Sequence, residues 1–241
     1  MSEMSAEGNL TKENLDIYLR ELGKQYRKLV GKNVPAELTI VGGAAVLICY
    51  GFRDMTNDID AVVQAGSAMK EAADIVRDKY GLSNSWLNSD FIHTASYTDK
   101  LAFYSTYYKT FSNVLTVRVV EREYLISMKL MSGRIYKNDI SDIIGILLSE
   151  RNKENSISLE NIIDASKKLY GRWENIPERS RKLIESVFAG NDLDELYTIY
   201  RNNEIIASQQ LDDFEQKYKG VITEDNVNDV LSALMKRRES E

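Results

Sequence analysis

The chain has 241 residues, 43% of them hydrophobic and 28% charged, which is typical of a soluble globular protein with one large domain or two modest ones. Its formal net charge of −6 argues against general affinity for nucleic acid, which needs a basic face. The sequence shows no run of 18 apolar residues and no signal peptide, and its single cysteine allows no internal disulfide, so we expect a cytoplasmic protein that contacts no membrane.

The first part of the chain alternates between helical and strand patterns. Leucines and tyrosines recur at helical spacing from Thr11, a candidate N-cap, to Gly31, which ends the pattern. The elements expected next are a strand at 37–41, a helix at 44–50, a strand at 58–63 and a helix at 67–80 that ends at Gly81. This alternation predicts a small α/β unit with a mixed or parallel sheet.

The later part of the chain is mainly helical in pattern. Residues 83–110 are rich in aromatic side chains and favour no element, whereas residues 113–120 alternate in the manner of a third strand. The helices expected after that strand lie at 121–133 and 138–152, with at least three more beyond them. We therefore expect an α/β domain at residues 1–150 and a helical domain at 151–241, with a soft boundary because the composition barely changes there.

A glycine pair, Gly42-Gly43, stands where the first expected strand turns directly into a helix. Backbone N–H groups at a helix N-terminus favour a bound phosphate, and glycine permits positive φ angles and a close approach of the backbone. The pair is therefore either a packing turn or a seat for phosphates, and alone it does not separate the two interpretations.

Two aspartates follow on the next expected strand. Residues i and i+2 of a strand point to the same face, so Asp58 and Asp60 project together while Ile59 faces the core. Two carboxylates held close repel each other unless a cation lies between them, and Mg²⁺ commonly bridges protein carboxylates to substrate phosphates. Together with the glycine pair, the aspartates favour a metal site beside a phosphate site over two solvated acids at a strand end.

Residues 42–63, GGAAVLICYGFRDMTNDIDAVV, resemble the signature of the nucleotidyltransferase superfamily, a GG or GS turn followed by D-x-D. The R-x-x-T-x-D-I-D form is similar to a branch that includes the AbiEii-type toxins, and it is carried here by Arg53, Thr56, Asp58 and Asp60. The resemblance implies a nucleotidyltransferase-like fold and the transfer of a nucleoside monophosphate from an NTP to an acceptor. It also implies that Arg53 and Thr56 contact the nucleotide.

Residues 128–147, MKLMSGRIYKNDISDIIGIL, resemble a later motif of the same branch, a lysine followed by an arginine and a K-D-x-x-D-like segment. The corresponding residues are Lys129, Arg134, Lys137, Asp139 and Asp142, and the chain departs from the motif by an intervening Asn138. The resemblance implies that the basic residues of this cluster contact the nucleotide.

Two interpretations of this second cluster stay open. In one, Lys129 or Arg134 offsets the charge of the β- and γ-phosphates as pyrophosphate leaves, while Asp142 orients the lysine or reaches toward the acceptor. In the other, the cluster is a salt-bridge network that pins two helices together.

The sequence lacks one expected acid. Two-metal nucleotidyl transfer usually employs a third carboxylate on the next strand. The expected strand at 113–120 holds Arg118 and no acid, and Glu121 and Glu123 come only at its end. Either one of these glutamates acts as the third carboxylate, or the site functions with the two aspartates alone, or it is catalytically impaired.

The expected function follows from both motifs. Asp58 and Asp60 hold Mg²⁺ or Mn²⁺, and the substrate is an NTP whose acceptor is RNA, such as a tRNA end, or a protein. The AbiEii resemblance implies a toxin of a toxin–antitoxin or phage-defence pair, with a cognate antitoxin as partner. The overall acidity suits a cationic aminoglycoside, so an antibiotic-modifying enzyme is an alternative, and the missing acid leaves a non-catalytic module that binds nucleotide or a partner as another.

Overall fold

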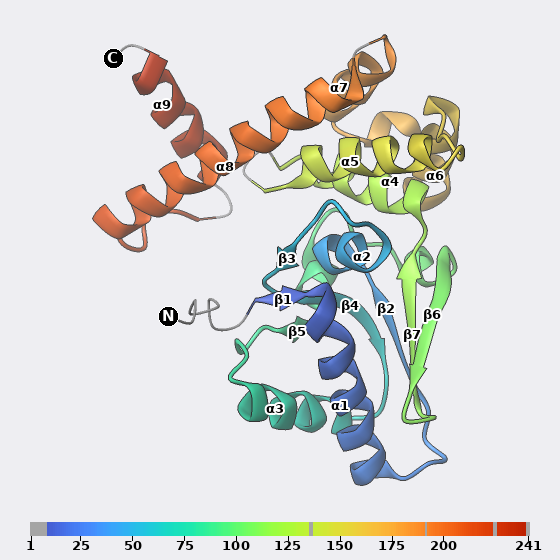
Figure 1. The fold of residues 1–241 in the computed structure, drawn as a ribbon. Helices are drawn as coiled ribbons and strands as arrows, with labels where there is room; N and C mark the ends of the chain where they lie inside the picture. The colour runs from blue at the N-terminus through green and yellow to red at the C-terminus, as the bar shows by residue number, and fades with distance from the viewer. Residues whose placement is uncertain (1–8, 135–136, 191, 224–225, 240–241) are drawn as a thin grey trace. The chain divides into compact units, whose positions relative to one another are not determined.

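The computed structural model describes residues 9–134, 137–190, 192–223 and 226–239 (Figure 1). The strands are β1 (Leu10–Thr11), β2 (Ala36–Ile40), β3 (Met55–Thr56), β4 (Ile59–Gln64), β5 (Leu87–Asn88), β6 (Ser105–Phe111) and β7 (Leu115–Val120). The α-helices are α1 (Lys12–Val30), α2 (Gly42–Cys49), α3 (Ala68–Tyr80), α4 (Arg122–Ser132), α5 (Asp139–Asn152), α6 (Leu159–Tyr170), α7 (Glu178–Phe188), α8 (Leu193–Lys217) and α9 (Val227–Glu239). Short 3-10 helices are η1 (Asp90–His93), η2 (Asp99–Ala102) and η3 (Trp173–Asn175).

The chain forms two compact units. The first unit runs to Met128 and also takes Lys168–Tyr170, and the second consists of Lys129–Lys167 and the chain from Gly171 onward. Residue 150, where we expect the α/β domain to end, lies within α5 of the second unit. The domain boundary stays a prediction.

In the described part of the first unit, β2 lies at the centre of a five-stranded sheet with the order β5-β4-β2-β7-β6. β2 runs parallel to β7 and antiparallel to β4, while β5 is parallel to β4 and β6 is antiparallel to β7. The predicted α/β fold with a mixed sheet is therefore confirmed. β5 and all but the last residue of β6 come from the stretch 83–110, which favoured no element in the sequence. β1 and β3 form a separate antiparallel pair.

One face of the sheet forms the core of the first unit. The nearly inaccessible side chains on this face alternate along three neighbouring strands and are Leu38, Ile40, Ala61, Val117 and Val119. α1 packs closely on this face, because a Cβ at Gly23 would lie only 3.1 Å from Phe111 Cβ. α1 and α3 pack against each other in the same unit (Figure 1).

The opposite face, which we call the site face, carries the other set of alternating residues. Val62 pairs with Thr39, and Thr39 pairs with Arg118, so these three side chains share a face. Asp60 lies two residues before Val62 on the same strand and therefore belongs to the same face. The sheet thus separates its apolar core from the predicted metal ligand.

The predicted elements with clear caps are confirmed. Thr11 is the N-cap of α1 and Gly31 is its C-cap, and α3 ends at Gly81 in a left-handed conformation with φ of 66°. The helix expected at 44–50 begins earlier, at the glycine pair, because the carbonyl of Val41 already accepts a bond from the N–H of Ala45.

The second unit is helical, as expected. α5 is buried on nearly all sides, with Ile143, Ile144 and Ile146 at most 1% exposed, and it packs against the long helix α8. Helices α6 to α9 confirm the prediction of at least three further helices beyond residue 152. Within the described ranges, no helix combines the length and apolar character needed to cross a membrane.

Candidate nucleotide site

The glycine pair forms the first turn of α2 at the end of the central strand. Val41 is extended and serves as the N-cap, and the first bond of the helical ladder joins the N–H of Ala45 to the carbonyl of Val41 at 3.3 Å. The N–H groups of Gly42, Gly43 and Ala44 therefore precede the ladder. Gly42 has a φ of 62°, a left-handed conformation that favours glycine. Such a turn offers a group of N–H donors to an anion.

Asp60 lies directly against this turn. A Cβ on Gly42 would meet Asp60 Oδ2 at 3.2 Å, and the N–H of Val41 donates to the Asp60 carbonyl at 2.9 Å. Ile59 is fully buried, whereas Asp58 and Asp60 on either side of it are half-buried, so both carboxylates project away from the core. Asp58 stands one residue before β4. A phosphate on the turn would be repelled by these carboxylates unless a cation lay between them.

Arg53 and Thr56 lie against the second glycine. A Cβ on Gly43 would be 2.7 Å from an amino nitrogen of Arg53 and 2.7 Å from Thr56 Oγ1, so only glycine fits without displacement. Arg53 is oriented by the bond from its Nε to the Met55 carbonyl at 3.0 Å, and Thr56 is buried in the β1–β3 pair. The arginine of the first motif therefore brings a positive charge to the same turn as Asp60.

The carboxylates fit a magnesium ion that completes its shell with substrate and water. Among the described residues, no group of three or more histidine, cysteine, aspartate or glutamate side chains forms a metal site. Mg²⁺ is often bound by one or two protein carboxylates together with substrate phosphates. Asp58 and Asp60 supply two such groups, and the carboxylate of Asp60 lies against Gly42. This donor set suits a metal that arrives with a nucleotide.

No third acid shares the site face within β7. The residues of β7 on this face are Arg118 and Val120, because alternate residues share a face. Glu121 follows the strand and its carbonyl accepts the N–H of Leu125 at the start of α4, and Glu123 accepts a bond from the neighbouring arginine at 3.0 Å. The absence of an acid in the strand, noted in the sequence, therefore holds in three dimensions.

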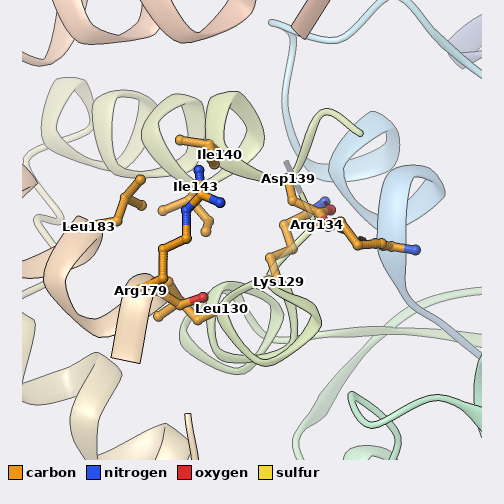
Figure 2. Close-up of a pocket in the computed structure, with 10 residues that line it drawn as sticks. Lys129, Leu130, Arg134, Asp139, Ile140, Ile143, Arg179 and Leu183 are labelled. Carbon is orange, nitrogen blue, oxygen red and sulfur yellow. Dashed lines mark hydrogen bonds and ion pairs between the residues drawn. The ribbon is translucent and has the colours of Figure 1, made fainter. Parts of the chain in front are cut away.

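The residues of the second motif lie in the second unit, around Lys129 at the end of α4. Its ammonium lies 2.9 Å from Asp139 Oδ1 and 2.8 Å from Asp142 Oδ2, and the three side chains are at most 6% exposed. Figure 2 shows Lys129 and Asp139 directed toward one another between α4 and α5. This is the salt-bridge network that we considered as the structural alternative, and the catalytic roles of Lys129 and Asp142 stay predictions.

Asp139 is the centre of the network. Ser132 Oγ donates to its Oδ2 at 2.7 Å, and Arg134 Nε donates to the same oxygen at 3.0 Å. Burial alone would raise the pKa of Asp139, but Lys129, Arg134 and the Ser132 hydroxyl hold that pKa well below its usual value. Asp139 is therefore an ionised structural partner of two cations.

The remaining two residues of the second motif differ in position. Lys137 is exposed, and its role as a nucleotide contact stays a prediction. Asn138 is the N-cap of α5, but its side chain makes no capping hydrogen bond.

Glu204 of α8 is a buried acid that sequence reasoning missed. Its Oε1 accepts the backbone N–H groups of Ile140 and Ser141, both at 3.1 Å, at the N-terminus of α5. Its Oε2 is buried without a hydrogen-bond partner in the described part of the chain. Burial raises the pKa of Glu204, although the two N–H donors oppose that rise. The only signal in the sequence was a glutamate beside two isoleucines in a long helix, which is too common to be informative.

A small pocket borders the lysine network in the second unit (Figure 2). Its walls combine apolar side chains of α4, α5 and α7 with charged ones, and Arg179 extends into it toward Ile143. None of the residues of the first motif lines this pocket.

The first unit combines a strand, a glycine turn and a helix, faced by an aspartate of the neighbouring strand. Residues 18–183, more than half of the chain, match the family described as "Nucleotidyltransferase of unknown function (DUF6036)". The chain belongs to this family, and hence to the nucleotidyltransferase superfamily. Neither a curated protein nor a solved structure matches it.

Proposed function

We propose that the protein transfers a nucleoside monophosphate from an NTP to an acceptor. The acceptor oxygen forms a bond to the α-phosphorus, and the bond from that phosphorus to the bridging oxygen of the β-phosphate breaks. Pyrophosphate leaves, and the proton of the acceptor hydroxyl is released to solvent. Mg²⁺, or Mn²⁺ in its place, held by Asp58 and Asp60, supplies positive charge at the phosphates when bound.

The residues around the glycine turn of the first unit have separate roles in this reaction. The N–H groups of Gly42 and Gly43 hold the phosphates, because they precede the helical ladder and are left without a partner within it. Arg53 offsets phosphate charge from the other side of the turn, and its planar guanidinium suits phosphate oxygens. Thr56 fixes the turn by packing against Gly43.

The observation that supports this function best is the contact of the two glycines with opposite charges. Asp60 lies against Gly42 and Arg53 lies against Gly43, so a carboxylate and a guanidinium flank one set of N–H donors. A packing turn requires neither charge. A metal–triphosphate complex requires both, because the metal needs the carboxylate and the phosphates need the cation.

For the acceptor and the biological role, the proposal follows the resemblance of both motifs to AbiEii-type toxins. The acceptor is RNA, such as a tRNA end, or a protein, and the chain acts as the toxin of a toxin–antitoxin or phage-defence pair with a cognate antitoxin. A local excess of arginine and lysine between residues 113 and 137 supports RNA over a small cationic antibiotic.

A second candidate is a module of the same fold that binds nucleotide without catalysis. The absence of a third acid on the site face of β7 favours it, because two-metal nucleotidyl transfer usually uses that acid. Such a module would bind Mg·NTP at the glycine turn and release no pyrophosphate.

The deciding experiment is label transfer. Purified protein is incubated with each α-labelled NTP, Mg²⁺ and total bacterial RNA or cell lysate, and pyrophosphate release is measured in parallel. The test variant is Asp58→Asn/Asp60→Asn, which keeps side-chain shape but removes the metal ligands' charge, and Gly51→Ala is the matched control because a Cβ there meets no atom within 4 Å. Label on RNA or protein only with intact aspartates supports transfer. Nucleotide binding without any release of pyrophosphate supports the binding module.

A further inference from the structure

The pocket beside the lysine network contains a buried hydroxyl without a partner. Ser180 of α7 lines this pocket and is only 8% exposed. Among the described residues, its hydroxyl takes part in no hydrogen bond. A Cβ on Gly133, which also lines the pocket, would lie 3.6 Å from Ser180 Oγ, so the hydroxyl is at the pocket wall. Because buried polar groups normally have partners, this hydroxyl indicates that the pocket takes a ligand with an acceptor atom.

Arg179, the neighbour of Ser180, brings a positive charge to the same pocket. Figure 2 shows its side chain extending into the pocket toward Ile143 of α5. In the part of the chain that the structure describes, its guanidinium donates no hydrogen bond and no carboxylate lies within ion-pair distance of it. The acid next to it in sequence, Glu178, binds Lys182 at 2.6 Å. The charge of Arg179 is therefore available to an anion.

Ser180 and Arg179 both belong to the first turn of α7, which has no side-chain cap. The N-cap is Pro177, and the first bond of the helical ladder joins the N–H of Arg181 to the Pro177 carbonyl at 3.0 Å. The N–H groups of the three residues between them precede the ladder. They give this end of the 11-residue helix a partial positive charge, which adds to the attraction for an anion.

The charges around the pocket favour an anion with a single negative charge. In the lysine network, Lys129 and Arg134 face the carboxylates of Asp139 and Asp142, so the formal charges of these four residues cancel. Arg179 then leaves one positive charge to be offset. A phosphoryl group carries a charge of about −1.5 to −2 at neutral pH, which exceeds the charge of Arg179 and would be costly to desolvate.

The walls favour a ligand with an aliphatic part. Four aliphatic side chains line the pocket, and they come from Leu130, Ile140, Ile143 and Leu183. The cavity volume is about 30 Å³, above the roughly 10–15 Å³ that one water needs but small for a ring system. A small ligand with a charged end and an apolar end therefore matches these walls better than an inorganic ion.

We infer that this pocket binds a short aliphatic monocarboxylate. The planar guanidinium of Arg179 pairs with the carboxylate, and the Ser180 hydroxyl donates to it. The aliphatic chain of the ligand lies on the walls that α4 and α5 provide. A bound carboxylate thus links α7 to α4 and α5 and stabilises the second unit. The inference does not depend on the proposed function, because neither Arg179 nor Ser180 has a part in the proposed nucleotidyl transfer.

The first test measures binding directly and without nucleotide. Equilibrium dialysis follows radiolabelled butyrate at constant ionic strength, and unlabelled propionate, acetate and inorganic phosphate are the competitors. We expect one butyrate per chain and an affinity that falls about fourfold with each methylene removed, the effect of one less buried CH₂ group. Phosphate should compete less well than butyrate does. Absence of saturable binding, an affinity independent of chain length, or tighter binding of phosphate would each overturn the inference.

The second test assigns the binding to the two residues. Arg179→Gln and Ser180→Ala should each weaken butyrate binding about tenfold or more, the effect of losing one hydrogen bond to a charged group. Arg172→Gln is the matched control, because this exposed arginine of the same unit pairs with Glu174 at 3.5 Å and does not line the pocket. Unchanged butyrate affinity in either test variant would overturn the inference.

Urea unfolding separates a lost ligand contact from a folding defect. Neither test variant loses a partner in the described structure, so without butyrate both should unfold close to the wild-type midpoint. Added butyrate should raise the midpoint of the wild type and of Arg172→Gln, because a ligand that binds only the folded state stabilises it. It should leave the midpoints of Arg179→Gln and Ser180→Ala nearly unchanged at the same concentration, and an equal rise in all four proteins would contradict the assignment.

Discussion

Replacing Lys129 with methionine should destabilise the protein by about 3–5 kcal/mol, the usual cost of removing one partner of a buried ion pair. Lys129 lies 2.8–2.9 Å from the carboxylates of Asp139 and Asp142, and each carboxylate is 4% exposed. The substitution leaves both carboxylates buried without the ammonium, and Asp139 keeps its contact with Arg134. Methionine preserves most of the volume, so the loss reports charge and not a cavity.

The assay is urea unfolding followed by circular dichroism at pH 7.5. The matched control is Lys182→Met, because Lys182 forms a pair with Glu178 in which both side chains are about 70% exposed. Exposed pairs contribute about 0–1 kcal/mol, so the control should change the free energy of unfolding by no more than that. A loss below about 1 kcal/mol in Lys129→Met would refute the view that this lysine stabilises the second unit.

The stability penalty of Lys129→Met should also depend on pH, in a direction that follows from the pKa of Asp139. In the wild type the pKa of Asp139 is held below its ordinary value of 3.8, so its contribution to stability is present above that pH and is lost as the pH falls through the lowered pKa. Without Lys129, burial dominates and the pKa of Asp139 rises, so the variant takes up a proton at higher pH. The penalty of the substitution should therefore be smaller at pH 5 than at pH 7.5. A penalty that grows on acidification would contradict this account.

Two further predictions concern other positions. Gly43→Ala places a Cβ 2.7 Å from both Arg53 and Thr56, so it should cost about 1–3 kcal/mol and weaken Mg·NTP binding measured by calorimetry, whereas Gly51→Ala should change neither. Because the pKa of Glu204 is raised, its contribution to the free energy of unfolding is fully present below the ordinary value of 4.5. That contribution is lost as the pH rises through the raised pKa. Glu204→Gln should therefore gain stability relative to wild type between pH 5 and pH 8 in urea unfolding, and the exposed Glu195→Gln should not.

The sequence was sufficient to predict the elements whose signals lie close together along the chain. α1 and α3 have a cap or a stop glycine directly at their ends, and the glycine turn with its aspartates spans fewer than twenty residues. β6 could not be predicted, because a bulge between Tyr107 and Lys109 interrupts the alternation of its exposed and buried residues. β5 is only two residues long, too short for any period to show.

The parts of the site that the sequence did not predict depend on distant partners. The contact of Gly43 with Arg53 requires the chain to return after α2. Glu204 meets the start of α5 across more than sixty residues of sequence. A pattern of residue types contains no information on such pairings, so the second motif fitted catalysis and a salt-bridge network equally well.

The arrangement at the glycine turn leads to a last prediction, on the form in which a nucleotide binds. The N–H groups of the turn and Arg53 attract phosphate, whereas Asp60, 3.2 Å from the position of a Cβ on Gly42, repels it. Under the proposed function, the wild type should bind Mg·NTP more tightly than the free nucleotide in EDTA.

Asp60→Asn should reverse this preference. Loss of the carboxylate weakens binding of the metal complex, and it strengthens binding of the free nucleotide on the order of tenfold, the effect of about 1.4 kcal/mol of relieved repulsion. Fluorescence anisotropy with a labelled NTP, in Mg²⁺ and in EDTA, measures both affinities on the same samples. If the aspartate only packed against the glycine, the uncharged amide would alter both affinities in the same direction, because a packing defect acts on the turn regardless of the charge of the ligand.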